Sequence, residues 1–340
     1  MSSKRTLASF VLGMAILFSL GTFASAEADL QAAKREGKVV WYVALTTDFN
    51  QQVCDLFNKK GFGVQCVFHR DGAGPLYRRY LQEAKSNINV ADVFTFSNLG
   101  YFLQLKQGGY LLPYRPRGTE RFNPFFTTED GSWMIPLATA QVPAYNTKLV
   151  KPSELPTSWT DFLRPEWKDR LVLPNPSFSG VAAEVMIVMV KKFGWDYFEK
   201  LAKQNPRIVP SASGTLTFVE RGESHMVVYA PLASVFDHAQ RGEPLKMFVP
   251  KEGVLVNGIP SAIPKNAPHP NAAKLFVDFL FSREVQQLIV DSGYHVGHPE
   301  VKYPPGLPPF EDLKPIFVSP EDAEKETPSM KEGFRKFFGV

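Results

Sequence analysis

The sequence predicts an α/β fold built on mostly parallel sheets and divided into two domains. Short apolar, β-branched runs alternate with amphipathic helical patterns, which is the arrangement of βαβ units. With 44% apolar and 21% charged residues, the composition is that of a globular protein and excludes a disordered chain. At roughly 100–200 residues per domain, the length indicates two domains.

The first part of the chain carries the most regular strand–helix alternation. Its apolar runs are typical of strands buried in a parallel sheet. The predicted elements are, in order, helix 29–36, strand 38–44, helix 49–59, strand 64–68, helix 76–85, strand 91–96 and helix 99–107.

The middle of the chain changes character, because residues 109–132 are rich in Pro, Gly and aromatic residues and predict a surface stretch. Beyond it, strands are predicted at 132–137, 140–146, 171–173, 208–209, 226–229, 246–250 and 254–257. Helices are expected to follow the loops near residues 180, 215 and 231. The last part is helical, with predicted helices at 271–280 and 283–292 and a charged terminal helix that ends near residue 338.

Residues 1–26 predict a cleavable export signal. Lys4 and Arg5 precede a short apolar stretch, and Ala24-Ser25-Ala26 provides a small-residue cleavage site. Removing these 26 residues from the 340 leaves 314, and losing two bases lowers the net charge from +4 to +2. An uncleaved membrane anchor is the alternative for this segment. No later segment reaches the roughly 18 apolar residues that span a bilayer.

The charge and the motifs exclude several function classes. A net charge this close to zero does not provide the basic surface that nucleic-acid binding requires. The chain has no G-x-S-x-G elbow, no phosphate-binding P-loop and no H-E-x-x-H sequence. His295 and His298 form the only close histidine pair, and a metal site would need further ligands. We therefore expect no metal and no cofactor.

Cys54 and Cys66 are the only cysteines. A helix end, a turn and a strand are predicted between them, and a helix that folds back on its next strand can bring such positions together. An oxidising compartment favours a disulfide, so a structural Cys54–Cys66 bond is predicted. A redox or metal pair lacks the usual ligand spacing, and two unpaired thiols stay an alternative.

A recurring loop type marks the candidate site. After several predicted strands, small hydroxyl, amide or glycine residues open a helix, whose first N–H groups can bind an anion. Ordinary helix capping explains any single loop, but the carboxyl ends of strands are where open α/β sheets bind ligands. The loops are Thr46-Thr47, Asp71-Gly72-Ala73-Gly74, Ser97-Asn98, Ser177-Phe178-Ser179-Gly180 and Ser211-Ala212-Ser213-Gly214-Thr215.

Aromatic and basic residues are the second group of candidates. Tyr229 ends a predicted strand and is expected to present its hydroxyl to a cleft. Arg70, Arg78 and Arg79 flank the glycine turn, and guanidinium groups suit carboxylate or phosphate. A solvated helix face is the favoured interpretation for Arg78 and Arg79.

Five blocks between residues 38 and 303 carry a family resemblance. Four are Val39-Val40-Trp41-Tyr42, Ala91-Asp92-Val93-Phe94, Tyr145-Asn146-Thr147-Lys148-Leu149-Val150 and Ser158-Trp159-Thr160-Asp161-Phe162. The longest is His269-Pro270-Asn271-Ala272-Ala273-Lys274-Leu275-Phe276-Val277-Asp278-Phe279-Leu280-Phe281-Ser282-Arg283-Glu284. As a set they resemble the family 1 extracellular solute-binding proteins of ABC importers, especially the ferric-iron-binding-protein-like branch.

The resemblance implies a type 2 periplasmic-binding-protein fold. In this fold two lobes, each a mostly parallel sheet flanked by helices, are joined by a two-strand hinge and close on ligand like a flytrap. The hinge strands would cross near residues 138–142 and 254–258. The implied organisation is signal peptide 1–26, lobe one from 27–138 and 258–340, and lobe two from 139–257.

The same resemblance raises the question of iron. Ferric members hold iron with a tandem tyrosine pair at the end of the strand that corresponds to residues 226–229, often with a histidine or acid in the first loop. Here Tyr229 is followed by Ala230, and the first loop is Leu45-Thr46-Thr47. The expected ligand is therefore a small organic phosphate, phosphonate or carboxylate, with ferric ion as the alternative.

The expected function is a periplasmic, non-enzymatic solute-binding protein that works as a monomer with the permease subunits of an ABC importer. The alternatives are a sensor that presents ligand to a receptor, and an exported hydrolase that uses a loop Ser or Thr. No histidine adjoins a candidate nucleophile in sequence. The candidate ligand-binding residues are Thr46, Thr47, Gly72, Ala73, Ser97, Asn98, Ser179, Gly180, Ser213, Gly214 and Tyr229.

Overall fold

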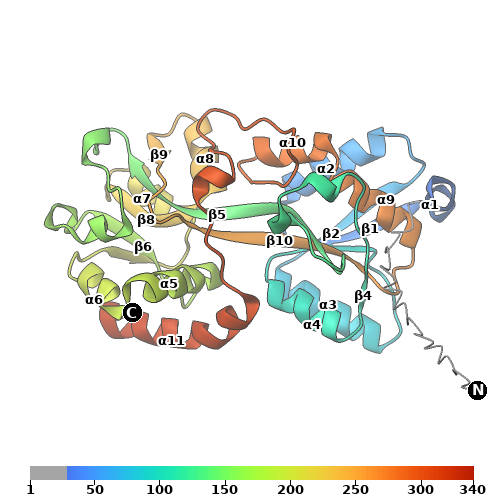
Figure 1. The fold of residues 1–340 in the computed structure, drawn as a ribbon, viewed down its shortest axis with the longest axis horizontal. Coiled ribbons are helices and arrows are strands. Elements are labelled where there is room, and N and C mark those ends of the chain that lie inside the picture. The colour runs from blue at the N-terminus through green and yellow to red at the C-terminus, as the bar shows by residue number, and fades with distance from the viewer. Residues whose placement is uncertain (1–28) are drawn as a thin grey trace, which may run out of the picture.

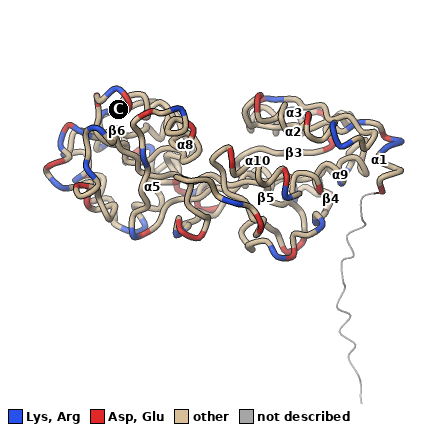
Figure 2. Tube along the Cα trace, turned by 90° about the horizontal axis from the view of Figure 1, so that it is seen from above, with Lys and Arg blue, Asp and Glu red and all other residues tan. Residues whose placement is uncertain are grey.

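Two lobes lie side by side and are joined by two long strands, as Figure 1 shows. The computed structural model describes residues 29–340, and the predicted export signal lies outside the described residues. Basic and acidic residues are interspersed over both lobes (Figure 2), in agreement with the small net charge of +4. In this part of the chain, no helix is long and apolar enough to cross a bilayer.

The first lobe contains the predicted βαβ series. Its elements are α1 (Leu30–Glu36), β1 (Lys38–Val43), α2 (Thr47–Lys59), β2 (Gln65–Arg70), α3 (Ala73–Lys85), β3 (Val93–Thr95), α4 (Leu99–Gln107) and β4 (Leu111–Leu112). β1 pairs in parallel with β2 on one side and β3 on the other.

Strand β1 is buried on both faces, which is why its sequence is a continuous apolar run. Trp41 packs edge-on against Phe276 at a ring distance of 5.2 Å, in the core that also holds Phe57 of α2. On the other face, Tyr42 belongs to a separate cluster with Leu76 of α3 and the helix that follows β3. Helices therefore cover both faces of this sheet.

The two lobes share the long strands β5 (Met134–Asn146) and β10 (Leu255–Pro264). They pair antiparallel from Leu137 opposite Ile259 to Gln141 opposite Leu255. In the strand order β2-β1-β3-β10-β5-β8-β6-β7, this pair lies between the strands of the two lobes. The two segments predicted to cross between lobes do pair with one another.

Strand β5 differs from the prediction of two separate strands, 132–137 and 140–146. It is continuous because its two prolines lie beside irregularities in the pairing. The register with β10 shifts between Leu137 and Met134, next to Pro136, and the register with β8 shifts around Pro143. Proline thus interrupts the hydrogen-bond ladder without ending the strand.

The second lobe repeats the α/β arrangement. Its elements are β6 (Leu171–Pro174), α5 (Gly180–Phe193), α6 (Trp195–Ala202), β7 (Arg207–Val209), α7 (Thr215–Glu220), β8 (Met226–Pro231), α8 (Leu232–Gln240) and β9 (Leu245–Met247). β6 pairs in parallel with β7 and β8.

Short 3₁₀ helices lie in the connections of both lobes. Their bounds are Thr119–Arg121, Pro124–Phe126, Pro152–Glu154, Trp159–Leu163, Pro165–Trp167 and Glu311–Leu313.

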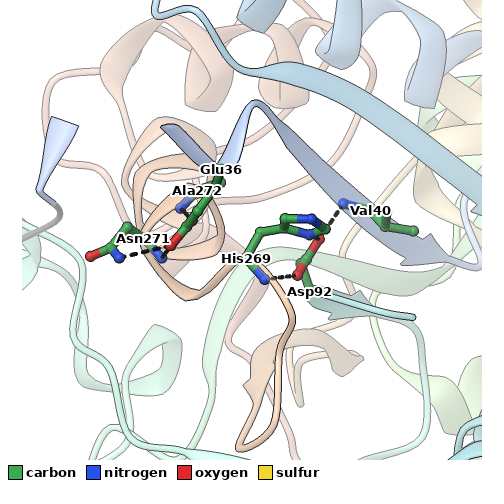
Figure 3. A network of polar contacts seen from close by, with 6 residues as sticks. All are labelled: Glu36, Val40, Asp92, His269, Asn271 and Ala272. Atoms are coloured by element: carbon green, nitrogen blue, oxygen red, sulfur yellow. Dashed lines mark hydrogen bonds and ion pairs between the residues drawn. The ribbon is translucent and has the colours of Figure 1, made fainter. Parts of the chain in front are cut away.

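Helices α9 (Pro270–Leu280) and α10 (Arg283–Asp291) return the chain to the first lobe. Two carboxylates fix this return (Figure 3). Asp92 accepts hydrogen bonds from the backbone N–H groups of Val40 at 2.7 Å and His269 at 2.8 Å. Glu36 accepts from the N–H of Ala272 at 2.7 Å, at the start of α9, where helix donors otherwise lack partners.

The terminal helix α11 (Pro320–Phe338) packs on helices of the second lobe. Lys191 of α5 forms ion pairs with Asp322 at 2.7 Å and Glu326 at 3.1 Å. Gly333 lies so close to Trp195 of α6 that a Cβ atom would overlap the indole ring. The prediction that residues 258–340 all belong to lobe one is therefore wrong for α11, whose apolar face is covered by α5 and α6.

A disulfide joins Cys54 of α2 to Cys66 of β2, as predicted. The two Cα atoms are 5.2 Å apart and both residues are buried. The bond fastens a helix to the next strand along the chain, which is a structural role.

Candidate ligand-binding cleft

A cavity of 610 Å³ lies between the two lobes, beside the hinge. Residues from α3 and α4 of lobe one line it on one side, and residues from α5 of lobe two line it on the other. Strand β10 and the C-terminal segment with α11 complete the lining. This cavity is therefore an interlobe cleft.

Two uncapped helix N-termini form the lobe-one wall. Ala73 and Gly74 at the start of α3, and Ser97 and Asn98 before α4, line the cavity. The N-cap of α3 is Gly72, which has no side chain, and the side chain of Asn98 makes no capping hydrogen bond. The first N–H groups of both helices lack intrahelical partners, which suits an anionic group.

The turn into α4 depends on Asn98, whose φ is 87°. This left-handed conformation is strained for most residues and is tolerated by Asn, whose short polar side chain can bond locally. β3 ends at Thr95, so the turn places the start of α4 directly at the carboxyl end of the sheet. That edge is where an open α/β sheet binds ligands.

The opposite wall carries a carboxyl group. Glu184 of α5 lines the cavity together with Val256, Asn257 and Gly258 of β10. The side-chain amide of Asn257 donates a hydrogen bond to Oε2 of Glu184. Burial raises the pKa of Glu184 above its ordinary value, and the hydrogen bond from Asn257 opposes this rise.

Aromatic residues line part of the same cavity. Tyr101 stacks on Tyr77 with ring centroids 4.4 Å apart, and Phe125 stacks on Phe317 at 4.5 Å. The hydroxyl of Tyr77 donates to Gln104 at 2.6 Å. Helix α11 adds a mixed wall of Pro320, Ala323, Glu324, Thr327 and Pro328.

The described lining contains two acidic residues, Glu184 and Glu324, and no Lys, Arg or His. An anion bound here would be held by backbone N–H groups and by polar side chains such as those of Ser97 and Gln104, not by a counter-charge. The arrangement can bind and orient a small polar solute.

The structure brings three of the predicted site residues to the cavity: Ala73, Ser97 and Asn98. They come from the loops after β2 and β3, two strands that flank β1 and point the same way. Parallel pairing places their carboxyl ends at one edge, which is the reason the sequence pattern identifies them.

The second-lobe loop before α5 serves mainly as a helix cap. Ser179 accepts a hydrogen bond from the N–H of Ala182 at 3.3 Å. Gly180 is the first residue of α5, and the next residue, Val181, lines the cavity. The loop thus reaches the cleft, with its hydroxyl engaged in capping.

The remaining loop residues lie outside the described lining. Thr46 and Thr47 are exposed at the start of α2, and Gly72 precedes the part of α3 that lines the cavity. Ser213 and Gly214 precede α7, and the N–H of Gly214 lies 3.3 Å from the hydroxyl of Ser211. This structure does not bring these residues into the cavity.

Tyr229 is enclosed within the second lobe. It is 1% exposed, and its hydroxyl has no hydrogen-bond partner among the described residues. Burial raises the pKa of Tyr229 well above its ordinary value, and the nearby Tyr197 adds to the rise. Both faces of β8 are buried from Met226 to Ala230, so the structure does not present this hydroxyl to the cleft.

The sequence analysis missed Glu184 and Asn257. One signal was available, because Glu184 is the only charged residue in the apolar segment from Gly180 to Val190 of α5. A lone acid in such a helix points to a partner or a ligand. Asn257 gave no comparable signal, since its role depends on α5 lying beside the hinge.

Within residues 29–340, no group of three or more His, Cys, Asp or Glu side chains is placed to hold a metal ion. His295 is buried, with Nε2 at 2.9 Å from the carbonyl oxygen of Pro308. His298 accepts a hydrogen bond from the N–H of Glu300 at 3.1 Å. The two histidines therefore contact different groups.

Comparison with known proteins gives a family. The sequence profile described as "Bacterial extracellular solute-binding protein" matches residues 89–309. The chain is similar to the "Fe(3+)-binding periplasmic protein" of Serratia marcescens, with 23% identity over 83% of this chain and 86% of that protein.

A second relative has a different printed ligand. The "Putative 2-aminoethylphosphonate-binding periplasmic protein" of Salmonella typhimurium is 31% identical over 42% of this chain and 44% of its own length. Among solved structures, iron-bound HitA from Pseudomonas aeruginosa superimposes with a TM-score of 0.72 and 23% identity, over 87% of this chain and 99% of that chain. This structural likeness shows a shared two-lobed fold.

Proposed function

Because the chain belongs to the family of bacterial extracellular solute-binding proteins, we propose that it captures a small organic anion in the interlobe cleft for an ABC importer. The proposed ligands are organic phosphates, phosphonates or carboxylates. A carrier without enzymatic activity is part of this proposal, and the family description and the relative named as a binding protein support it.

The observation that carries this proposal is the convergence of two uncapped helix N-termini on one cavity. Ala73 and Gly74 of α3 and Ser97 and Asn98 before α4 supply unpaired backbone donors and a hydroxyl. Such donors, with the partial positive charge of the helix ends, favour an anion without a basic side chain.

The two-strand hinge supports capture by closure. β5 and β10 are the elements that join the lobes, so a change in their twist would move one lobe against the other. A ligand that contacts both walls binds the closed form better than the open form and shifts the population toward it. Closure would then present the loaded protein to the permease subunits of the importer.

The predicted export signal and the relatives named as periplasmic proteins support a periplasmic location. We propose that the mature chain, residues 27–340, acts there as a monomer. Import and sensing differ in the partner that receives the closed form, and a genomic neighbourhood that encodes permease and ATPase subunits would favour import.

Ferric ion is the second candidate ligand, and the similarity to the Serratia iron-binding protein favours it. Ferric ion prefers several anionic oxygen ligands. Glu184 and Glu324 are the acids in the described lining, Tyr101 is the one tyrosine there, and Tyr229 does not reach it. These donors make iron the less favoured of the two ligands.

Isothermal titration calorimetry of the mature chain tests the choice. Organic phosphates, phosphonates and carboxylates are titrated separately, and ferric citrate is the competing probe. Micromolar or tighter binding of one organic anion supports the proposal. Tight ferric binding with no response to any organic anion would overturn it.

A further inference from the structure

The carboxylate of Glu184 is only partly satisfied by the protein. Its Oε2 accepts a hydrogen bond from the amide nitrogen of Asn257. In the described chain, the second oxygen, Oε1, has no protein partner. A half-buried carboxylate that receives one neutral hydrogen bond is only partly compensated for the water it has lost, and a cation is the partner that compensates it best.

Asn257 leaves one oxygen of this carboxylate facing the cavity. Its amide nitrogen donates to Oε2 of Glu184, because the amide oxygen would be repelled there. The amide oxygen Oδ1 therefore points elsewhere, and it is buried with no hydrogen-bond partner among the described residues. The acceptor that a bound solute can reach is thus Oε1 of Glu184, which lines the cavity.

An ammonium group fits this acceptor. It carries three N–H donors and a positive charge, so it can donate to the free oxygen of the Glu184 carboxylate and compensate its charge. Tyr101, Phe125 and Phe317 line the same cavity, and aromatic faces attract cations.

The wall formed by lobe one prefers the opposite charge, an anion. The N-termini of α3 and α4 favour negative charge, whereas the half-buried Glu184 repels it. A ligand that is negative throughout gains at one wall and loses at the other. A ligand with an anionic end and an ammonium end gains at both.

We propose that the solute is a small zwitterion whose ammonium group is bound by the carboxylate of Glu184, which Asn257 holds in place. This inference rests on the proposed function, which supplies the anion-binding wall. The ammonium contact would also stabilise the closed form. The anionic end would contact lobe one, and the ammonium end would contact α5 of lobe two beside the hinge strand.

Matched probe pairs test the ammonium contact. Each zwitterion is compared with an analogue in which a methyl group replaces the ammonium group. The pairs are 2-aminoethylphosphonate with propylphosphonate, phosphoethanolamine with propyl phosphate, and 3-aminopropanoate with butanoate. Ferric citrate is titrated as well.

The expected result is that at least one zwitterion binds the wild-type chain roughly 30-fold or more tightly than its methyl analogue. Glu184→Gln keeps an acceptor for Asn257 and should abolish most of this preference. Glu184→Asp should restore part of it. Glu324→Gln, at the exposed acid of the same cavity, is the matched control and should change the preference by less than about threefold.

The outcomes separate the two proposals. If the methyl analogues bind as tightly as the zwitterions, or if Glu184→Gln keeps the preference, the ammonium assignment is wrong and the anion proposal stands. If ferric citrate binds and no member of any pair does, both proposals fail. If no probe binds, neither ligand class is supported and both are abandoned. Should Glu184→Gln fail to fold, the wild-type preference alone decides.

Discussion

The side-chain amide of Asn257 donates a hydrogen bond to the carboxylate of Glu184, so the hinge strand β10 and helix α5 of the second lobe are directly connected. The two residues are 73 positions apart in the sequence. The contact lies in the wall of the interlobe cavity. A ligand that binds Glu184 therefore contacts the second lobe at the point where it meets the hinge.

This pair predicts a measurable coupling. Asn257→Ala leaves the Glu184 carboxylate without its protein partner and should lower the free energy of unfolding by about 1–3 kcal/mol at pH 8. In a Glu184→Gln background the same substitution should cost less, because a neutral amide is easier to leave unpaired. Urea denaturation of the four proteins measures the coupling. Strictly additive effects would show that the two side chains do not interact in solution.

Tyr229→Phe should leave ligand affinity unchanged and should not lower stability. The hydroxyl it removes is buried and has no partner within residues 29–340, so its loss removes a desolvation cost. Tyr197→Phe is the matched control, because the Tyr197 hydroxyl donates to the carbonyl oxygen of Trp159 at 3.1 Å. That control should lose about 1 kcal/mol of stability. If Tyr229→Phe lowered the ligand affinity and Tyr197→Phe did not, Tyr229 would be a ligand-binding residue.

Asp92 should be essential for the stability of the first lobe. Asp92→Ala removes the acceptor for two backbone N–H groups and leaves them unpaired at a half-buried site. We expect a loss of about 3 kcal/mol in the free energy of unfolding. Asp312→Ala, at an exposed acid, should lose less than about 0.5 kcal/mol. Equal stabilities for the two variants, measured by urea denaturation, would mean that Asp92 does not fasten the return of the chain.

His295 should make the fold sensitive to acid. The carbonyl of Pro308 can only accept, so Nε2 carries the proton and the buried Nδ1 is bare. Burial lowers the pKa of His295 from 6.5 to about 4. Between these pH values the unfolded chain binds the additional proton. The stability contributed by neutral His295 is therefore present above pH 6.5 and is lost as the pH falls toward 4.

The variant His295→Phe isolates this contribution. Between pH 7 and pH 4 the wild type should lose up to about 3 kcal/mol more stability than the variant does. Chemical denaturation at pH 7, 5.5 and 4 provides the comparison. Parallel pH profiles would show that His295 is protonated equally in the folded and unfolded states.

Much of the fold could be predicted, because local chemistry dictates it. The apolar run of β1 is buried on both faces, and the loops after β2 and β3 follow from parallel pairing. The predicted break in β5 was wrong because Pro136 and Pro143 stop a strand only where the ladder needs their N–H groups. The place of α11 was missed because an amphipathic helix shows that it has a partner and not which lobe supplies it.

Site residues that lie in a single loop after a strand could be predicted. Those that become neighbours only when two distant elements pack together were missed. Ser97 and Asn98 are identifiable from the strand that precedes them. Glu184 and Asn257 become a pair only when α5 packs beside β10, and no local pattern encodes that contact. Tyr229 was assigned to the cleft from its position at a strand end, but both faces of β8 are buried there.

The central claim is that one small solute bridges the two walls of the interlobe cleft. The most direct measurement is a crystal structure of the mature chain with its tightest-binding probe. We predict the anionic group at the N-termini of α3 and α4, near Ser97 and Asn98, and the ammonium group against Glu184. Density for the probe outside this cavity, or a probe whose ammonium group points away from Glu184 into solvent, would contradict the account.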